Sequence, residues 1–200
     1  KGDGPSGRPG VMARFGLDYP SVVKDNPSVV YLSVTGFGQN GPNANLPATD
    51  SVMQAYSGLM TATRDSTGMP IRAGLLVIDI STGLYAFQAV SAALYRRAMR
   101  GKGKYIETSL MEAIGAFQAA KMIEYTLEGS DLQPLGVPLG TFEAKDGYIN
   151  INGRRDAHFK ALCRAIGHDE LIDDPRFATV AARYKNEAAL MPVVRAAVQK

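Results

Sequence analysis

A long helical pattern in the middle of the chain limits the possible folds most strongly. The predicted helix begins at Ser81 or Thr82 and ends at Met99. Apolar residues recur along it at helical spacing, at Leu84, Phe87, Val90, Ala93 and Leu94. Gly101 then follows a basic last turn, which is a common way for a helix to end. The sequence therefore predicts one long amphipathic helix in this region.

Strands and shorter helices are predicted on both sides of this helix. Residues 28–34 are β-branched and apolar, which fits a buried strand, and residues 105–110 form a second strand pattern. Capping residues and apolar spacing predict further helices over residues 17–25, from 49 or 50 to 57, and over 111–127.

The character of the sequence changes after Gly129, where proline and glycine become frequent. A strand pair is predicted over residues 140–144 and 148–152, with a turn at Asp146-Gly147. A helix capped by Asp156 and a last helix after Asn186 follow. We therefore expect a domain boundary near residue 130, which separates residues 1–130 from residues 131–200.

Composition excludes several classes of function. Apolar residues make up 46% and charged residues 20% of the chain, as in a globular protein. The net charge of +3 is too small for a nucleic-acid footprint, and one cysteine with two histidines is too few for a usual zinc site. We therefore expect no bound metal. We also expect no membrane span, because no apolar run approaches the ~18 residues that a span needs, and no signal peptide, because the amino terminus has no apolar h-region. A single cysteine agrees with a cytoplasmic location.

Residues 36–41 have the G-x-G-x-x-G spacing of dinucleotide-binding loops and follow a predicted strand. That fingerprint requires a helix to begin at the glycines. Because Pro42 and Asn43 follow without a helical pattern, a glycine-rich turn is the favoured interpretation. Residues 96–104 carry five positive charges in nine positions. They favour a helix end over a phosphate contact.

Asp79 is a carboxylate among apolar neighbours in the segment GLLVIDISTGLY, at the start of the predicted long helix. One interpretation is an ordinary helix cap. The other is a nucleophile that the helix dipole and backbone donors keep ionised. Such a carboxylate can attack an activated carbonyl, and the same N–H groups would stabilise the oxyanion. The residues by themselves leave both interpretations open.

Several segments together resemble the class III CoA-transferase (CaiB/BaiF) family, which includes formyl-CoA transferase and the carnitine and bile-acid CoA-transferases. In chain order they are RPGVMARFGLDYPSVVKDNPSVVYLSVTGFGQNGP, DSVMQAYSGLM, GMPIRAG, DISTGLYAFQAVSAALYRR, GKGKYIETSLMEA, PLGTFEAKDGYI and DDPRFAT. The resemblance implies an α/β fold: an incomplete Rossmann-like large CoA-binding domain, a smaller α/β domain and an interlocked homodimer. It covers roughly residues 8–190.

The resemblance also implies a reaction, in which CoA moves from an acyl-CoA thioester to a free small carboxylic acid. Asp79 matches the family nucleophile, which forms a mixed anhydride and then an aspartyl-CoA thioester. No cofactor is expected to be permanently bound, because the CoA thioester is a substrate. Arg14 matches a position that contacts the CoA nucleotide, and a segment along the CoA corresponds to Leu46, Pro47, Ala48 and Thr49. A glycine-rich active-site loop corresponds loosely to Gly136 and Gly140.

Two further hypotheses remain beside the transferase. The family also contains α-methylacyl-CoA racemases, which use a histidine thirty residues before the aspartate; here that position is Thr49, which is no base near neutral pH. Family chains are also about twice as long as this one. The third hypothesis is therefore a non-catalytic or incomplete CoA-transferase-like domain, or a fragment that is not active by itself. The donor and acceptor acids are not predicted.

Overall fold

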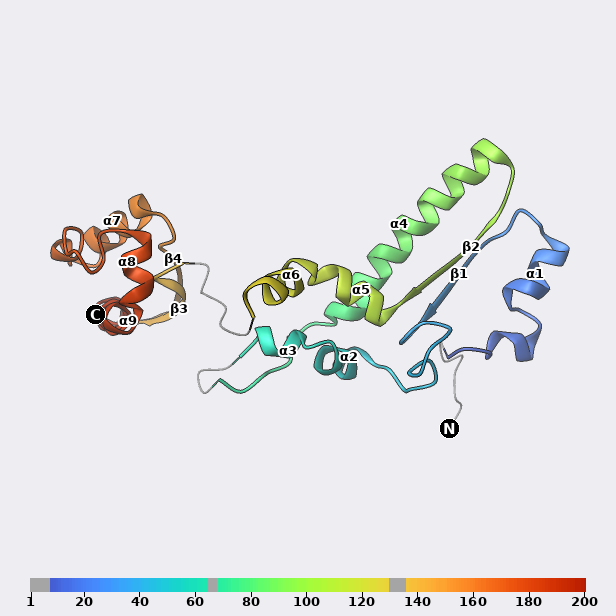
Figure 1. Ribbon diagram of the computed structural model, residues 1–200, viewed down its shortest axis with the longest axis horizontal. Coiled ribbons are helices and arrows are strands. Elements are labelled where there is room, and N and C mark those ends of the chain that lie inside the picture. Colours follow the sequence, from blue (N-terminus) through green and yellow to red (C-terminus); the bar gives the residue numbers. More distant parts are fainter. Residues whose placement is uncertain (1–7, 65–67, 130–135) are drawn as a thin grey trace. The chain divides into compact units, whose positions relative to one another are not determined.

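The computed structural model describes residues 8–64, 68–129 and 136–200. Two compact units are present, Lys1–Ile123 and Glu124–Lys200 (Figure 1). The boundary predicted near residue 130 falls on residues 130–135, which lie outside the described residues. Along the chain the elements are η1 (Met12–Phe15), α1 (Tyr19–Asp25), β1 (Val30–Thr35), α2 (Asp50–Tyr56), α3 (Leu59–Ala62), α4 (Val77–Arg100), β2 (Lys104–Ser109), α5 (Leu110–Phe117), α6 (Ala119–Glu128), β3 (Leu139–Ala144), β4 (Gly147–Asn152), α7 (Asp156–Ala165), η2 (Asp169–Leu171), α8 (Val180–Lys185) and α9 (Glu187–Val198).

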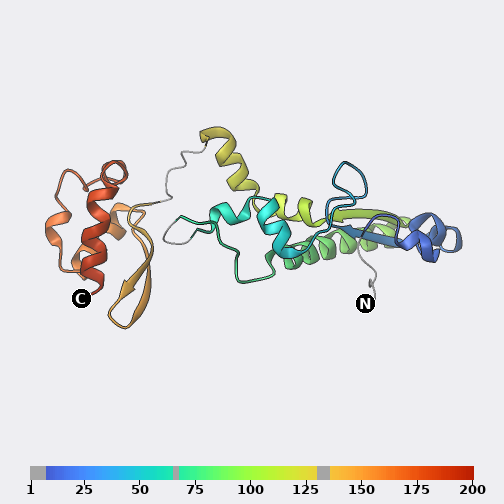
Figure 2. The same cartoon turned by 90° about the horizontal axis from the view of Figure 1, so that it is seen from below.

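The first unit contains a parallel strand pair with a helical crossover. β1 and β2 pair in register from Val30 opposite Lys104 to Thr35 opposite Ser109. Parallel neighbours need such a crossover, and α4 lies alongside both strands (Figure 2). β1 is mostly half-buried rather than buried as predicted, and Val34 keeps 36% of its surface exposed. The fold is thus mixed α/β, as expected.

Helix α4 begins at Val77, four residues before the predicted start at Ser81. The prediction used the usual capping hydroxyls, but in the structure Ser81 and Thr82 donate to the carbonyl of Ile78, one turn earlier. Asp79 consequently lies inside the first turn of the helix. The helix ends as predicted, with Gly101 at a φ of 67° and Arg97 and Arg100 in the last turn. The predicted helix end is confirmed for residues 96–100, whereas Lys104 already begins β2.

The helix predicted over residues 111–127 is wrong as one continuous element. It is divided into α5 and α6 at Gln118. The side-chain amide of Gln118 donates to the carbonyl of Ser57 at 2.9 Å, which anchors the break to the segment after α2. Apolar spacing continues across the break, so the sequence pattern does not reveal it.

The second unit packs a hairpin against helices. β3 and β4 pair antiparallel, from Leu139 opposite Asn152 to Ala144 opposite Gly147, as predicted, although Lys145 and Asp146 form the turn. Its apolar cluster includes Phe142 of β3 together with side chains of the helices. The predicted cap at Asp156 is wrong, because Arg155 precedes the helix and Asp156 instead accepts a hydrogen bond from Arg183.

Helix α4 is also long and apolar enough, by length and composition, to cross a membrane, and among the described residues it alone meets that test. Scattered polar residues hide this property from a search for continuous apolar runs. The observation is weak evidence of a span, since the core helix of a globular protein passes the same test. Here α4 packs against β1, β2, α2 and α5.

Candidate active site

The carboxyl ends of the two parallel strands, where α/β proteins usually bind ligands, carry the glycine loop. Gly36 follows β1, and a Cβ added there would collide with the side chain of Ala48. Gly38 and Gly41 adopt φ values of 96° and 102°, which glycine tolerates. No helix begins between these glycines and α2. The glycine-rich turn is therefore confirmed, and the dinucleotide fingerprint is absent.

Side chains of the strands hold this loop in place. Glu107 of β2 accepts a hydrogen bond from the N–H of Gln39 at 2.7 Å, and the amide of Gln39 donates to the hydroxyl of Ser33 at 2.5 Å. Thr35 accepts one from the N–H of Gly38 at 2.9 Å. Sequence inspection missed these contacts, because Glu107 and Gln39 are 68 positions apart.

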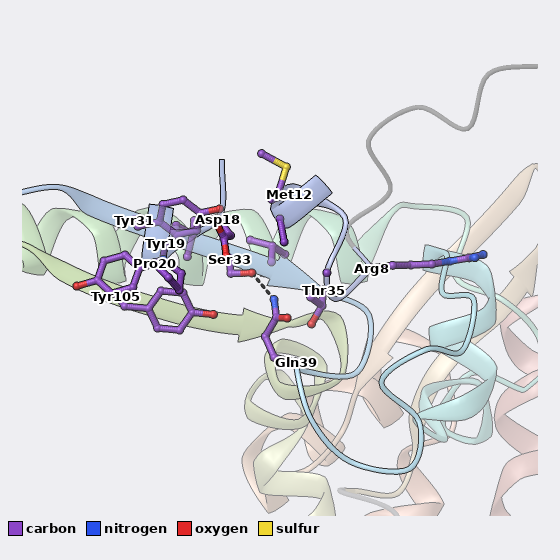
Figure 3. A pocket seen from close by; sticks show the side chains of 14 residues that line it. Arg8, Met12, Asp18, Tyr19, Pro20, Tyr31, Ser33, Thr35, Gln39 and Tyr105 are labelled. Carbon is purple, nitrogen blue, oxygen red and sulfur yellow. Dashed lines mark hydrogen bonds between the residues drawn. The ribbon is translucent and has the colours of Figure 1, made fainter. Parts of the chain in front are cut away.

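A cavity of about 610 Å³ opens over the strand pair, between β1, β2 and the segment from η1 to α1 (Figure 3). Tyr19, Tyr31 and Tyr105 gather at one end of it, with ring centroids 5.1–6.0 Å apart. Arg8 lies at the other end, near Thr35. Burial is the main cause that raises the pKa of Tyr105 above its ordinary value.

A second cavity of about 370 Å³ lies at the carboxyl edge of β1. Leu46, Pro47, Ala48 and Thr49, which the resemblance places along the CoA, all line it. Thr49 also caps α2 by accepting a hydrogen bond from the N–H of Val52. The structure brings these four residues together. Arg14, in contrast, is exposed in η1 and is not among the residues that line either cavity.

Asp79 is not a helix cap. The residue before the helix, Leu76, makes no capping bond with its side chain. The capping group is the carboxylate of Asp50. Its Oδ2 accepts a hydrogen bond from the N–H of Ile78 at 2.8 Å and from the N–H of Asp79 at 3.1 Å. Two of the backbone N–H groups at this helix start, where an oxyanion site is predicted, are thus already bonded. The Asp79 side chain is exposed, and its carboxylate has no hydrogen-bond or ion-pair partner among the described residues.

The electrostatic environment of Asp79 differs from the expectation. Partial burial, and secondly the negative charge of Asp50, raise the pKa of Asp79 above its ordinary value of 3.8. Backbone N–H groups that bonded the carboxylate of Asp79 would instead lower its pKa. The expectation fails because the N–H groups of Ile78 and Asp79 donate to Asp50 and not to the carboxylate of Asp79.

The two glycines of the predicted active-site loop lie in the second unit. Gly140 is the second residue of β3 and pairs with Ile151, so it lies in the strand that was predicted over residues 140–144. Gly136 packs closely on Arg154, where an added Cβ would be 2.9 Å from the arginine Cβ. Their role in catalysis stays a prediction. In residues 8–64, 68–129 and 136–200 no group of three or more histidine, cysteine, aspartate or glutamate side chains forms a metal-binding arrangement.

The parallel strand pair and its crossover helix define a mixed α/β protein, and Asp79 is an exposed carboxylate in the first turn of that helix. The sequence model described as "CoA-transferase family III" matches residues 5–200. The chain belongs to that family.

Curated relatives and solved structures agree with this assignment. The chain is 38% identical to acetyl-CoA:oxalate CoA-transferase of Acetobacter aceti over 96% of its own length and 51% of the relative. It is 33% identical to succinate–glutarate CoA-transferase of Agrobacterium fabrum, over 92% and 47%. A CaiB/BaiF family protein from Brucella suis matches with a TM-score of 0.82 and 34% identity, over 96% of this chain and 52% of that one. The chain thus spans about half the length of the relatives it matches.

Proposed function

We propose that the protein is an acyl-CoA:carboxylate CoA-transferase in which Asp79 is the nucleophile. The observation that supports the proposal most directly is the state of this side chain. It is exposed in the first turn of α4 and has no partner among the described residues, so that its carboxylate is free to attack an activated carbonyl. Family membership supplies the reaction class.

In the proposed reaction, Asp79 forms covalent intermediates first with the donor acyl group and then with CoA. Its carboxylate oxygen attacks the thioester carbonyl of the donor, the C–S bond breaks, and a mixed anhydride and CoA thiolate form. The thiolate then attacks the aspartyl carbonyl, which releases the donor acid and leaves an aspartyl-CoA thioester. The acceptor carboxylate attacks that thioester and expels the thiolate. Attack of the thiolate on the acceptor acyl group yields the new acyl-CoA and frees Asp79.

The remaining predicted residues are assigned to substrate binding in the same proposal. The segment of Leu46, Pro47, Ala48 and Thr49 would lie along the CoA, and Arg14 would contact its nucleotide. Short carboxylic acids are the proposed acyl class, because the relatives named above act on acetyl, oxalate, succinate and glutarate groups. An interlocked homodimer and a cytoplasmic location, both implied by the resemblance or the composition, belong to this proposal too.

Trapping of the covalent intermediate tests the proposal. The protein is incubated with acetyl-CoA or succinyl-CoA, with and without oxalate or glutarate, and is then treated with hydroxylamine or borohydride. Mass spectrometry is expected to locate the modification on the peptide that contains Asp79. The variant Asp79→Asn should give no adduct.

Asp146→Asn is the matched control, because Asp146 is an exposed aspartate in the turn between β3 and β4. It should form the adduct as the unaltered protein does. Absence of any adduct, at concentrations where CoA binds, would contradict the transferase. Deuterium exchange at the α-carbon of a branched acyl-CoA would instead support the racemase.

A further inference from the structure

A buried carboxylate on α2 supports the start of the helix that carries Asp79. Asp50 is 4% exposed and is the first residue of α2. Its Oδ2 atom accepts both N–H bonds described above, from residues that lie 28 and 29 positions later in the chain. A capping residue normally immediately precedes its helix. Here the capping group of α4 comes from another helix.

Gln54, one turn later on α2, completes this arrangement. It is fully buried, and its side-chain amide donates to Oδ1 of Asp50 at 2.5 Å and to the carbonyl of Leu75 at 3.1 Å. The oxygen of the same side-chain amide, Oε1, accepts a hydrogen bond from the N–H of Ala73 at 2.9 Å. Asp50 and Gln54 thus fix the backbone from Ala73 to Asp79.

We infer that Asp50, held by Gln54, is a positioning residue for Asp79. The inference rests on the proposed role of Asp79 as the nucleophile. Asp50 never needs to touch a substrate: it fixes the backbone at Asp79 by hydrogen bonds and presents a negative charge beside it. It also follows Thr49 directly, and so joins the segment proposed to lie along the CoA to the nucleophile.

The charge of Asp50 has a separate consequence from its hydrogen bonds. α4 packs against α2, α5, β1 and β2. Among the described residues of these elements, Asp50 is the charged group that acts on the pKa of Asp79, after partial burial. Because like charges favour the protonated form of a carboxyl group, removal of this charge lowers the pKa of Asp79. A purely structural cap would have no such effect.

The variant Asp50→Asn removes the charge and keeps one oxygen that can accept the N–H bonds of Ile78 and Asp79, but it loses the acceptor for the Gln54 amide. The acid limb of the rate of adduct formation should move to lower pH. At neutral pH the rate should fall by about 10–100-fold, because the nucleophile is less basic and less well placed, with a much smaller change in KM for the acyl-CoA. Asp50→Ala removes the acceptor as well, and should also speed hydrogen exchange at the amides of Ile78 and Asp79.

Asp25→Asn is the matched control, because Asp25 is an exposed carboxylate at the end of α1. It should leave the pH profile unchanged. The pKa of Asp79, followed by NMR of its carboxyl carbon, is measured in the same proteins and needs no activity. If the unaltered protein forms no adduct while Asp50→Asn still lowers the pKa of Asp79, the proposed function fails and the positioning effect stands.

Two results would overturn the inference. One is an Asp50→Asn protein with the pKa of Asp79 and the pH profile both unchanged. The other is an Asp50→Asn protein that does not fold, because Asp50 would then support the whole unit and not the position of Asp79 in particular.

Discussion

The two compact units bury different kinds of side chain. In the part of the chain that the structure describes, unit Glu124–Lys200 encloses an apolar cluster of nine buried residues. The apolar cluster of the longer unit Lys1–Ile123 contains three, Met53, Ile78 and Ile114. The buried polar side chains show the reverse distribution. Arg183 lies in the shorter unit, while the longer one contains Thr35, Asp50, Gln54, Ser81, Thr82 and Ser109. Apolar burial organises the smaller unit, and hydrogen bonds organise the interior that surrounds the candidate nucleophile.

Among the described residues, each unit contains one buried charged side chain with several partners, Asp50 in one and Arg183 in the other. Arg183 donates to the carbonyls of Val137 and Phe177 and to Asp156, and its guanidinium lies 4.5 Å from the ring centroid of Phe159. Asp50 instead accepts hydrogen bonds from the backbone of Ile78 and Asp79, and the side chain of Asp79 is exposed. The buried charge thus bonds residues around an apolar core in one unit and the backbone at the candidate nucleophile in the other.

Replacement of Asp79 should give the largest effect and should separate activity from stability. Asp79→Asn is expected to lower the rate of CoA transfer by at least about 10³-fold, as for other lost nucleophiles. Because its pKa is raised on folding, the ionised form destabilises the folded state. This effect is absent below the ordinary pKa of 3.8, and it grows to its full size as pH rises above the raised value. Calorimetry should therefore find a Tm for Asp79→Asn at pH 7 that is no lower than that of the unaltered protein. A clearly lower value would contradict the assignment.

Arg183→Met should show the opposite combination in the other unit. It leaves two buried carbonyls without their donors, and is expected to reduce the free energy of unfolding by about 2–4 kcal/mol. Urea unfolding of the full chain, with hydrogen exchange at β3 and α7, measures this loss. Arg176→Met is the control: Arg176 is 61% exposed and pairs with Asp174, so its removal should cost less than about 1 kcal/mol. Equal losses for both variants would show that burial of Arg183 is unimportant.

Gly36→Ala tests the close contact between Gly36, which follows β1, and the side chain of Ala48. The added methyl group would collide with Ala48, and overpacking of this kind costs about 1–3 kcal/mol. Because Ala48 must move, binding of CoA should weaken as well, which calorimetric titration measures. A variant with unaltered stability and CoA affinity would place the CoA away from residues 46–49.

Gly115→Ala should give the smallest effect, with the opposite sign. Gly115 lies inside α5, and an added Cβ would contact nothing within 4 Å. Alanine favours the helix, so we expect the free energy of unfolding to rise by about 0.5–1 kcal/mol. Denaturant unfolding beside Gly36→Ala gives the comparison. A loss at Gly115 would show that this face of α5 is covered by a contact in solution.

Much of the secondary structure was predictable from local patterns. The hairpin of β3 and β4, the last helix after Asn186 and the end of α4 at Gly101 follow from turn chemistry and apolar spacing. The start of α4 was placed too late and the break at Gln118 was missed. Both depend on partners far away in the sequence: Asp50 caps α4, and Ser57 accepts from Gln118.

The sequence by itself determined the family, the mixed α/β class and Asp79 as the candidate nucleophile. Ordered motifs and local spacing are properties of consecutive residues, so a single sequence carries them. Only the tertiary structure decided which carboxylate receives the backbone donors at the start of α4. That choice depends on α2 packing beside α4, and it gives the donors to Asp50, leaving Asp79 exposed with a raised pKa. Two aspartates that look alike in the sequence thereby have different surroundings.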